Sequence, residues 1–206
     1  FTMQVQRDVV NMSSSKGIMN IDVLSFSRLV HRIFSETGKP KEKILDDLGK
    51  SLLLRHVAQL IKKDLPSIGS GMTKAGFVDE VKSVISEFMQ YDLSYEQIDM
   101  MIRASENKGA LYAKLKDLNA LYRAFNDHIS EKYMSSESSL SLCAQKIPGS
   151  ELIRDSVIAF DGFTGFTPIQ YRVLRALYNN SSELIFSIIM GDDTDPYERN
   201  PNIKGL

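Results

Sequence analysis

The sequence predicts an α/β protein that is interrupted by a large all-helical insertion. Three short apolar runs have the composition of β-strands, and they lie at residues 21–24, 157–160 and 184–190. Between the first and second runs, residues from about 40 to 145 show almost only the periodicity of amphipathic helices. A compact insertion with close ends would allow the strands on either side of it to pair in one sheet.

The helices are predicted from apolar spacing and from residues that start helices. One helix extends from the N-terminus to about residue 12, and a second follows Ser25 or Ser27, either of which can cap it. Ser94 and Gln97 have the spacing of a capping box. The serine-rich stretch at residues 135–141 is predicted to be a surface loop. Further helices are expected over residues 44–64, 72–91, 95–103, 111–133 and 169–178.

Composition excludes several classes of protein. The 206 residues carry a formal net charge of −1, and 43% of them are hydrophobic, as in an ordinary globular protein. No apolar run reaches the roughly 18 residues of a membrane span, and there is no recognisable signal peptide, so we expect a cytoplasmic protein without membrane contact. A single cysteine, Cys143, excludes an internal disulfide. Because the chain begins at Phe1 and stops soon after an apolar run, we expect an internal fragment of a larger protein.

The apolar run at residues 157–160 is followed directly by Asp161. Gly162, Gly165 and Pro168 then form a predicted turn before an amphipathic helix begins. Ligands of open parallel sheets bind at the carboxyl ends of strands. Nucleotide-hydrolysing α/β domains place there the Asp that holds Mg²⁺ beside the phosphates. The sequence therefore predicts a site of this kind around Asp161.

This segment resembles a motif of the UvrD/RecB-type helicases, which reads Asp-Glu-Phe-Gln-Asp-Thr-x-Pro-x-Gln. The matching positions are Asp161, Phe163, Pro168 and Gln170. Gly162 stands where that family has its catalytic Glu, and Thr164 and Gly165 replace its Gln and second Asp. Loss of a positioned general base typically costs about 10²–10⁴ in rate. The form Asp-Gly-Phe-x-x-Phe-Thr-Pro also resembles the AddB family, the non-motor subunits of bacterial AddAB (RexAB-like) helicase–nucleases.

A second resemblance covers Ser25-Phe-Ser-Arg-Leu29, which matches Ser-Phe-x-Arg-Leu of AddB proteins. UvrD-type helicases contact single-stranded DNA with the equivalent strand end, and residues 1–4 resemble another short AddB stretch. An aromatic ring stacks on any base, and Arg pairs with phosphate. The alternative for Phe26 is packing in the core, the commoner place for a lone aromatic residue. The resemblance implies DNA contacts by Thr2, Phe26, Arg28, His31, Phe163 and Phe166.

The distribution of charge is a weaker indication of nucleic-acid binding. Residues 28–63 contain nine Lys or Arg and four acidic residues, a local net charge of +5. Such a segment can form a phosphate-binding face. From charge alone, the solvated sides of amphipathic helices are the favoured interpretation.

A third resemblance lies at residues 191–197. Active helicases read Val-Gly-Asp-x-x-Gln-Ser-Ile-Tyr after a strand, and the Gln senses the γ-phosphate. Here Asp195 stands where that Gln would be, and an acidic side chain repels phosphate. A generic acidic loop is the alternative. The expected degenerate ATP-site positions are Asp161, Gly162, Gln170, Asp192 and Asp195.

The resemblance implies a partial RecA-like parallel sheet, the 1A domain, at residues 1–38 and 151–206, with a helical 1B subdomain at residues 39–150. It implies a segment with no catalytic or metal-binding residues. The subunit would belong to an ATP-dependent helicase/deoxyribonuclease, with Mg²⁺, ATP and a 4Fe-4S cluster bound outside this segment. Such a subunit works with an AddA-like motor on double-stranded DNA ends and scans single-stranded DNA for the Chi sequence. The alternatives are a segment of an active superfamily-one helicase and a helical protein-interaction module.

Overall fold

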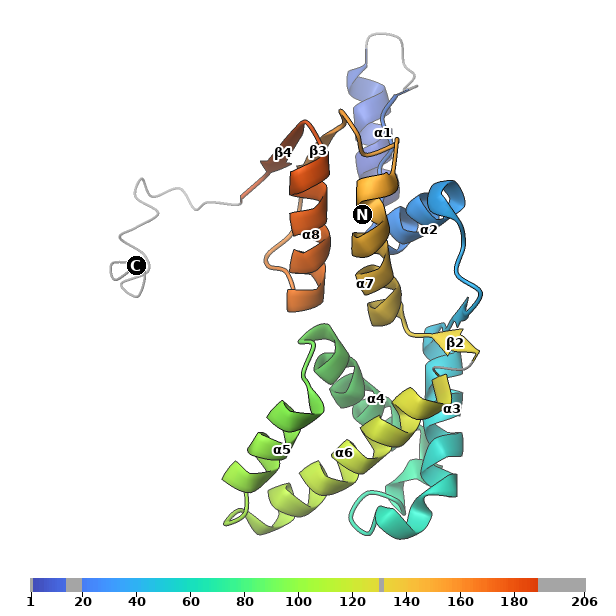
Figure 1. The fold of residues 1–206 in the computed structure, drawn as a ribbon, viewed down its shortest axis with the longest axis vertical. Helices are drawn as coiled ribbons and strands as arrows, with labels where there is room; N and C mark the ends of the chain where they lie inside the picture. The colour runs from blue at the N-terminus through green and yellow to red at the C-terminus, as the bar shows by residue number, and fades with distance from the viewer. Residues whose placement is uncertain (1, 14–19, 130–131, 189–206) are drawn as a thin grey trace, which may run out of the picture.

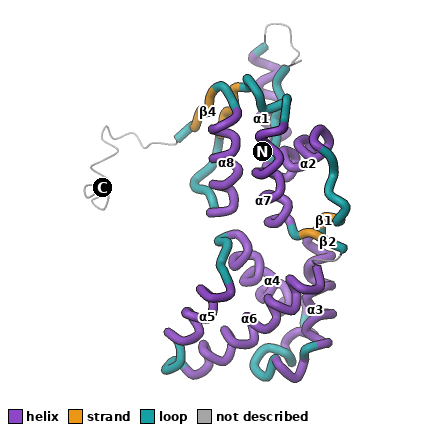
Figure 2. Tube along the Cα trace, in the orientation of Figure 1, coloured by secondary structure: helices purple, strands orange, loops and turns teal. Residues whose placement is uncertain are grey.

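The computed structural model describes residues 2–13, 20–129 and 132–188, which form two lobes (Figure 1). We call residues 45–129 the helical lobe, and the described residues on either side of them the sheet lobe. Helices make up most of both lobes (Figure 2). Each lobe has its own hydrophobic core, and the two cores share no residue within the described ranges.

The helical lobe contains four α-helices around one core. They are α3 (Asp47–Leu60), α4 (Ala75–Gln90), α5 (Tyr95–Ala104) and α6 (Gly109–Ile129), with the 3-10 turns η1 (Lys62–Asp64) and η2 (Gly71–Thr73) between α3 and α4. Each of the four helices contributes fully buried apolar side chains, among them Leu54, Ile85, Ile98 and Phe125. The apolar periodicity therefore identified these helices correctly: α3, α4 and α6 are shorter than predicted, and α5 is one residue longer.

Local signals fix the starts of two helices as predicted. Ser94 Oγ accepts a hydrogen bond from Gln97 N at 3.3 Å, and Gln97 Oε1 accepts one from Ser94 N at 2.8 Å, which completes the capping box of α5. At α2 (Phe26–Thr37), Ser25 is the N-cap, and its hydroxyl accepts from Arg28 N at 3.3 Å. These bonds satisfy amide groups that the first turn of a helix leaves unpaired.

A pair of two-residue strands lies where the lobes join. β1 (Lys43–Ile44) precedes the helical lobe and β2 (Tyr133–Met134) follows it, and the two pair in parallel. Leu45 N donates to Met134 O at 2.8 Å, and Lys43 N donates to Lys132 O at 3.2 Å. The helical lobe therefore leaves and rejoins the rest of the chain at adjacent points.

The sheet lobe packs α2 and α8 (Pro168–Asn180) against α7 (Ser136–Lys146), which is followed by the 3-10 turn η3 (Ile147–Gly149). Its core contains Ile33, Cys143, Ile147 and Val173, all fully buried. Burial raises the pKa of the Cys143 thiol to about 12, which makes it an unreactive core residue. The helix α1 (Thr2–Met12) has no buried residue.

Two strands form the sheet of this lobe. β3 (Val157–Phe160) and β4 (Glu183–Phe186) pair in parallel, with Val157 opposite Glu183 and Phe160 opposite Phe186. α8 connects them, so the segment is a βαβ unit. Two of the three predicted strands are thus parallel neighbours in one sheet.

The prediction of a strand at residues 21–24 is wrong. Residues 21–24 have an irregular backbone, and within the described ranges they make no backbone hydrogen bond to β3 or β4. Asp22 instead forms an ion pair with Arg32 of α2 at 2.9 Å. A four-residue apolar run is a weak signal because a strand is defined by the partner that hydrogen-bonds to it.

The predicted serine-rich loop is also wrong, because most of it forms the start of α7. Ser135 is the N-cap, and its hydroxyl accepts from Ser138 N at 3.0 Å. Ser139 Oγ donates to Ser136 O at 2.6 Å, which satisfies that hydroxyl within the helix. Serine favours loops only where its hydroxyl competes with the helix, and here it caps or bonds within it.

The strand predicted at residues 184–190 is shorter and less buried than expected. β4 ends at Phe186, and Ile185 and Phe186 are 45% and 44% exposed. On α8, Leu174 and Leu177 are buried as predicted, whereas Tyr171 is 58% exposed. The sheet has only two strands in the described part of the chain, so its apolar residues lack a second covering layer.

Candidate nucleic-acid interface

Aromatic side chains gather where β3 and β4 end. Phe160, the last residue of β3, is buried and stacks on Phe186 of β4, with ring centroids 5.1 Å apart. Its ring also contacts Phe26, Phe163 and Phe166 at centroid distances of 6.2, 5.8 and 5.8 Å. We call these five phenylalanines the aromatic cluster.

The cluster is only partly covered. Phe26 and Phe166 are half-buried, whereas Phe163 and Phe186 are 41% and 44% exposed. Tyr171 of α8 extends the surface, since its ring lies 5.9 Å from that of Phe166 and is exposed. Exposed rings that are held by other rings give flat apolar faces at fixed positions, which is what base stacking requires.

Two exposed residues with nitrogen-donor side chains follow Phe26 on α2. Arg28 lies two residues after Phe26 in the first helical turn, and His31 lies one turn further on. Both side chains are exposed, and neither forms an ion pair with any residue in the described ranges. Arg32 is engaged with Asp22. Of the nine Lys and Arg in residues 28–63, Lys50 is buried and paired with Glu137, so not all of them are available to bind phosphate.

A cavity of about 670 Å³ adjoins the cluster. Its lining includes residues 20–26, the whole of β3, and Thr2 of α1. Five of the six predicted DNA-binding residues thus lie in one region. Thr2, Phe26 and Phe163 line the cavity. The Phe166 ring contacts the rings of Phe26 and Phe163, and Arg28 is on the adjoining helical turn. His31 is exposed one turn beyond.

Asp161 follows β3 directly and is exposed, as the sequence predicts. Its carboxylate accepts a hydrogen bond from the Ser187 hydroxyl, one residue past β4. Ser187 N also donates to Phe160 O at 2.9 Å. Asp161 therefore connects the carboxyl ends of the two strands.

The other residues that match the helicase motif also have local structural roles. Pro168 is the first residue of α8, where its missing N–H costs nothing. Gln170 Oε1 accepts from Thr167 N at 2.8 Å and so stabilises the start of the same helix. Phe163 packs in the aromatic cluster. Every matching residue thus has a structural role in the strand–turn–helix.

Gly162 has a φ angle of +73°, a left-handed conformation that L side chains adopt only at a cost. A glycine here allows the chain to turn sharply after Asp161. Asp192 and Asp195, the remaining predicted ATP-site positions, lie outside the described residues. Within the described ranges, no three His, Cys, Asp or Glu side chains are grouped so that they could bind a metal ion.

We expect Gly162→Glu to lower stability without producing ATP hydrolysis. A β-carbon in this left-handed conformation costs roughly 1–2 kcal/mol, and the Asp161 carboxylate beside it is already bonded to Ser187. The measurements are the urea midpoint of the 206-residue chain and its release of phosphate from ATP. Gly165→Ala is the matched control, because an added Cβ meets nothing within 4 Å and the φ angle is ordinary. ATP turnover by Gly162→Glu would contradict the prediction.

Sequence reasoning did not identify Tyr171, Phe186 and Ser187 as part of this site. The rule that selected Asp161, a polar residue just past an apolar run, also applies to Ser187. The predicted strand extended to residue 190 and therefore placed Ser187 inside the strand, whereas β4 ends at Phe186.

Fold and site together define an α/β protein with a partly exposed aromatic cluster at the carboxyl ends of two parallel strands. The chain belongs to the family described as ADDB, N-terminal, whose family model matches residues 1–203. Among the described residues, no helix is long and apolar enough to span a membrane.

Relatives of known name agree with this family. An ATP-dependent helicase/deoxyribonuclease subunit from Lachnoclostridium phytofermentans is 41% identical over 192 residues, which are 93% of this chain and 17% of that protein. Proteins of the same name from Alkaliphilus oremlandii and Alkaliphilus metalliredigens are 31% and 32% identical over 190 residues, 92% of this chain. The chain spans about a sixth of the length of these relatives.

Proposed function

We propose that this chain is the non-motor, helicase-like segment of a helicase/deoxyribonuclease subunit, and that it binds single-stranded DNA. The observation that carries the proposal is the aromatic cluster at the carboxyl ends of β3 and β4, with Phe163 and Phe186 exposed. Ligands of parallel sheets bind at this end of the strands. Bases stack on the two rings, and Arg28 pairs with the phosphate backbone.

The proposed architecture is a partial RecA-like 1A domain at residues 1–38 and 151–206, with a helical 1B insertion at residues 39–150. The βαβ unit of β3, α8 and β4 supports it. So does the free edge of β3, which faces the cavity near residues 20–26. Parallel sheets are normally larger and covered on both faces, so a neighbouring strand from the rest of such a subunit would fit at this edge.

The absence of motor activity in this segment is part of the proposal. Gly162 has no carboxylate to orient water, and Asp161 is bonded to Ser187. In the longer subunit, Mg²⁺, ATP and a 4Fe-4S cluster would be bound by other parts. Its partner would be an AddA-like motor subunit. Together they would process double-stranded DNA ends in recombinational repair, and this subunit would scan the unwound strand for the Chi sequence.

The binding test uses a fluorescent oligothymidylate and the 206-residue chain. Phe163→Ala and Phe186→Ala should each weaken binding by about 5- to 150-fold, because a base–aromatic stack contributes about 1–3 kcal/mol. Arg28→Gln should weaken binding and reduce its salt dependence by about one ion. Anisotropy titrations at several salt concentrations measure both.

Tyr178→Ala is the matched control for this titration. Tyr178 lies on α8 and is 73% exposed, and within the described ranges its ring contacts no other aromatic ring. Its removal should leave affinity unchanged. Equal affinities for Phe163→Ala, Phe186→Ala and the unchanged chain would contradict the proposal. Phe26→Ala is a poorer probe than Phe163→Ala. Each of the two rings contacts three others, but Phe26 is half-buried and Phe163 is 41% exposed, so loss of Phe26 disturbs packing more.

A further inference from the structure

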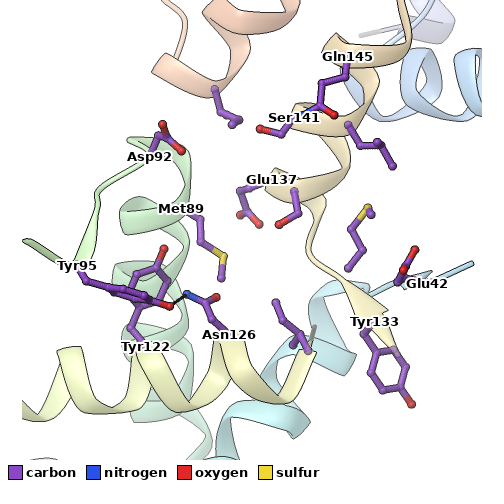
Figure 3. A pocket seen from close by; sticks show the side chains of 15 residues that line it. Glu42, Met89, Asp92, Tyr95, Tyr122, Asn126, Tyr133, Glu137, Ser141 and Gln145 are labelled. Carbon is purple, nitrogen blue, oxygen red and sulfur yellow. Dashed lines mark hydrogen bonds between the residues drawn. The ribbon is translucent and has the colours of Figure 1, made fainter. Parts of the chain in front are cut away.

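A second cavity, of about 520 Å³, lies between the two lobes (Figure 3). One wall comes from α4, α5 and α6 of the helical lobe, and the other comes from α7. Polar side chains such as Asn126, Glu137, Ser141 and Gln145 line it. Met89 of the helical core and Leu142 beside the sheet-lobe core also line it, so each core reaches the cavity and the two remain separate clusters.

One side of this cavity is firmly held. Tyr133 of the β1–β2 pair lies there, and Lys50 of α3 and Glu137 of α7 form an ion pair nearby, which we call the inner ion pair. Lys50 Nζ lies 3.1 and 3.2 Å from the two Glu137 carboxylate oxygens and 2.7 Å from Ser86 Oγ. The Lys50 and Glu137 side chains are 6% and 8% exposed, so separating them would strand charges away from water.

On the opposite side, α4 contacts α7 and α8, and an exposed ion pair joins the two lobes. Arg172 of α8 forms an ion pair with Asp92, between α4 and α5, which we call the outer ion pair. Its two side chains are 51% and 45% exposed, and exposed pairs contribute little to stability and are screened by salt. Figure 3 places Asp92 and Tyr133 on opposite sides of the cavity.

Two local features of the outer ion pair bear on its opening, the backbone conformation of Asp92 and a second hydrogen bond of Arg172. Asp92 has a φ angle of +55°, a conformation that Asp and Asn tolerate better than most residues. Arg172 also donates to Ser141 Oγ of its own lobe at 3.4 Å, so it keeps a partner when Asp92 moves away.

We propose that the helical lobe rotates as a body about the β1–β2 pair and the inner ion pair, and that the outer ion pair holds it in the closed position. Release of Arg172 from Asp92 opens the cavity on that side. Opening gives water access to a lining that is part polar, as at Asn126 and Gln145, and part apolar, as at Met89 and Ile169. The motion changes the position of the helical lobe relative to α8 without disturbing either core.

The test measures distances between spin labels on the 206-residue chain. Labels on Met100→Cys in α5 and Tyr178→Cys in α8 report the distance between lobes, since these residues are 59% and 73% exposed. Labels on Met100→Cys and Leu60→Cys report a distance within the helical lobe. Cys143 is fully buried and its thiol pKa is raised to about 12, so it does not take up the label.

Arg172→Gln and Asp92→Asn should each broaden the distribution between lobes and lengthen its mean, and the double variant should add nothing further. At about 1 M sodium chloride the Debye length is about 3 Å. This salt concentration should lengthen and broaden the inter-lobe distances of the unsubstituted chain, and it should not change those of Arg172→Gln further. Arg175→Gln is the matched control on α8: Arg175 is exposed and forms no ion pair in the described ranges.

Distributions that match the parent in both outer-pair variants would overturn the proposal. So would a change in only one of them, or an equal change in Arg175→Gln. Broadening within the helical lobe would also overturn it, because the lobe would then be loosening rather than rotating.

Discussion

Replacing Lys50 with methionine is expected to lower the free energy of unfolding by about 3–5 kcal/mol, as is typical when one partner of a buried ion pair is removed. The Glu137 carboxylate would remain 8% exposed without its cation, and Ser86 would lose the amine that its hydroxyl accepts from. Chemical denaturation of the 206-residue chain, followed by circular dichroism, measures the change.

Two further variants make this expectation specific. The double variant Lys50→Met with Glu137→Leu should recover most of the lost stability, because no unpaired charge then remains buried. Lys82→Met is the comparison for a lysine with exposed partners, since Asp47 and Asp79 are 85% and 63% exposed. It should cost about 1 kcal/mol or less. Similar losses for Lys50→Met and Lys82→Met would show that burial does not set the energy of the inner ion pair.

Phe160→Ala is expected to destabilise the chain by about 3–5 kcal/mol, the usual range for a buried phenylalanine, and also to abolish measurable DNA binding. Phe160 is 8% exposed and its ring contacts all four other members of the aromatic cluster. Its removal leaves a cavity and frees Phe163 and Phe186 from their fixed positions. Denaturation and oligothymidylate anisotropy on the same preparation, at a temperature where the variant is folded, measure both effects.

Phe186→Ala separates the two effects. Phe186 is 44% exposed, so its truncation should cost less stability than that of Phe160 while still weakening DNA binding. If Phe160→Ala binds DNA as well as the unchanged chain does, the cluster is a packing unit only. If Phe186→Ala destabilises as much as Phe160→Ala, exposure is a poor guide to the packing of this sheet.

Local sequence signals predicted much of the fold. Hydrogen bonds between residues three positions apart explain why the caps at Ser25 and Ser94 could be identified from the sequence. The runs that became β3 and β4 were recognisable because both are apolar. The end of β3 was marked by Asp161, whereas the end of β4 at Phe186 was not predicted, because apolar residues continue after Ser187. The helical lobe followed from periodicity alone.

Contacts between distant residues explain what could not be predicted. Glu137 sits in a stretch that looks like a loop, and it is buried because Lys50, 87 positions earlier in the chain, neutralises it. Residues 21–24 are irregular because, in the described part of the chain, no neighbouring strand pairs with them. Phe26 was weighed as either a core or a DNA-contacting residue, and its half-buried place in the aromatic cluster gives it features of both.

The adjacent ends of the helical lobe also have a consequence for how the chain folds. The core of this lobe uses residues from a single uninterrupted stretch, 54–129, whereas the core of the sheet lobe joins residue 30 to residue 177. Contacts between near neighbours form early, and closing a long flexible loop is entropically costly. The four helices should therefore assemble first and bring β1 beside β2. The effective loop that separates α2 from α7 is then much shorter, which speeds the later docking of these two helices.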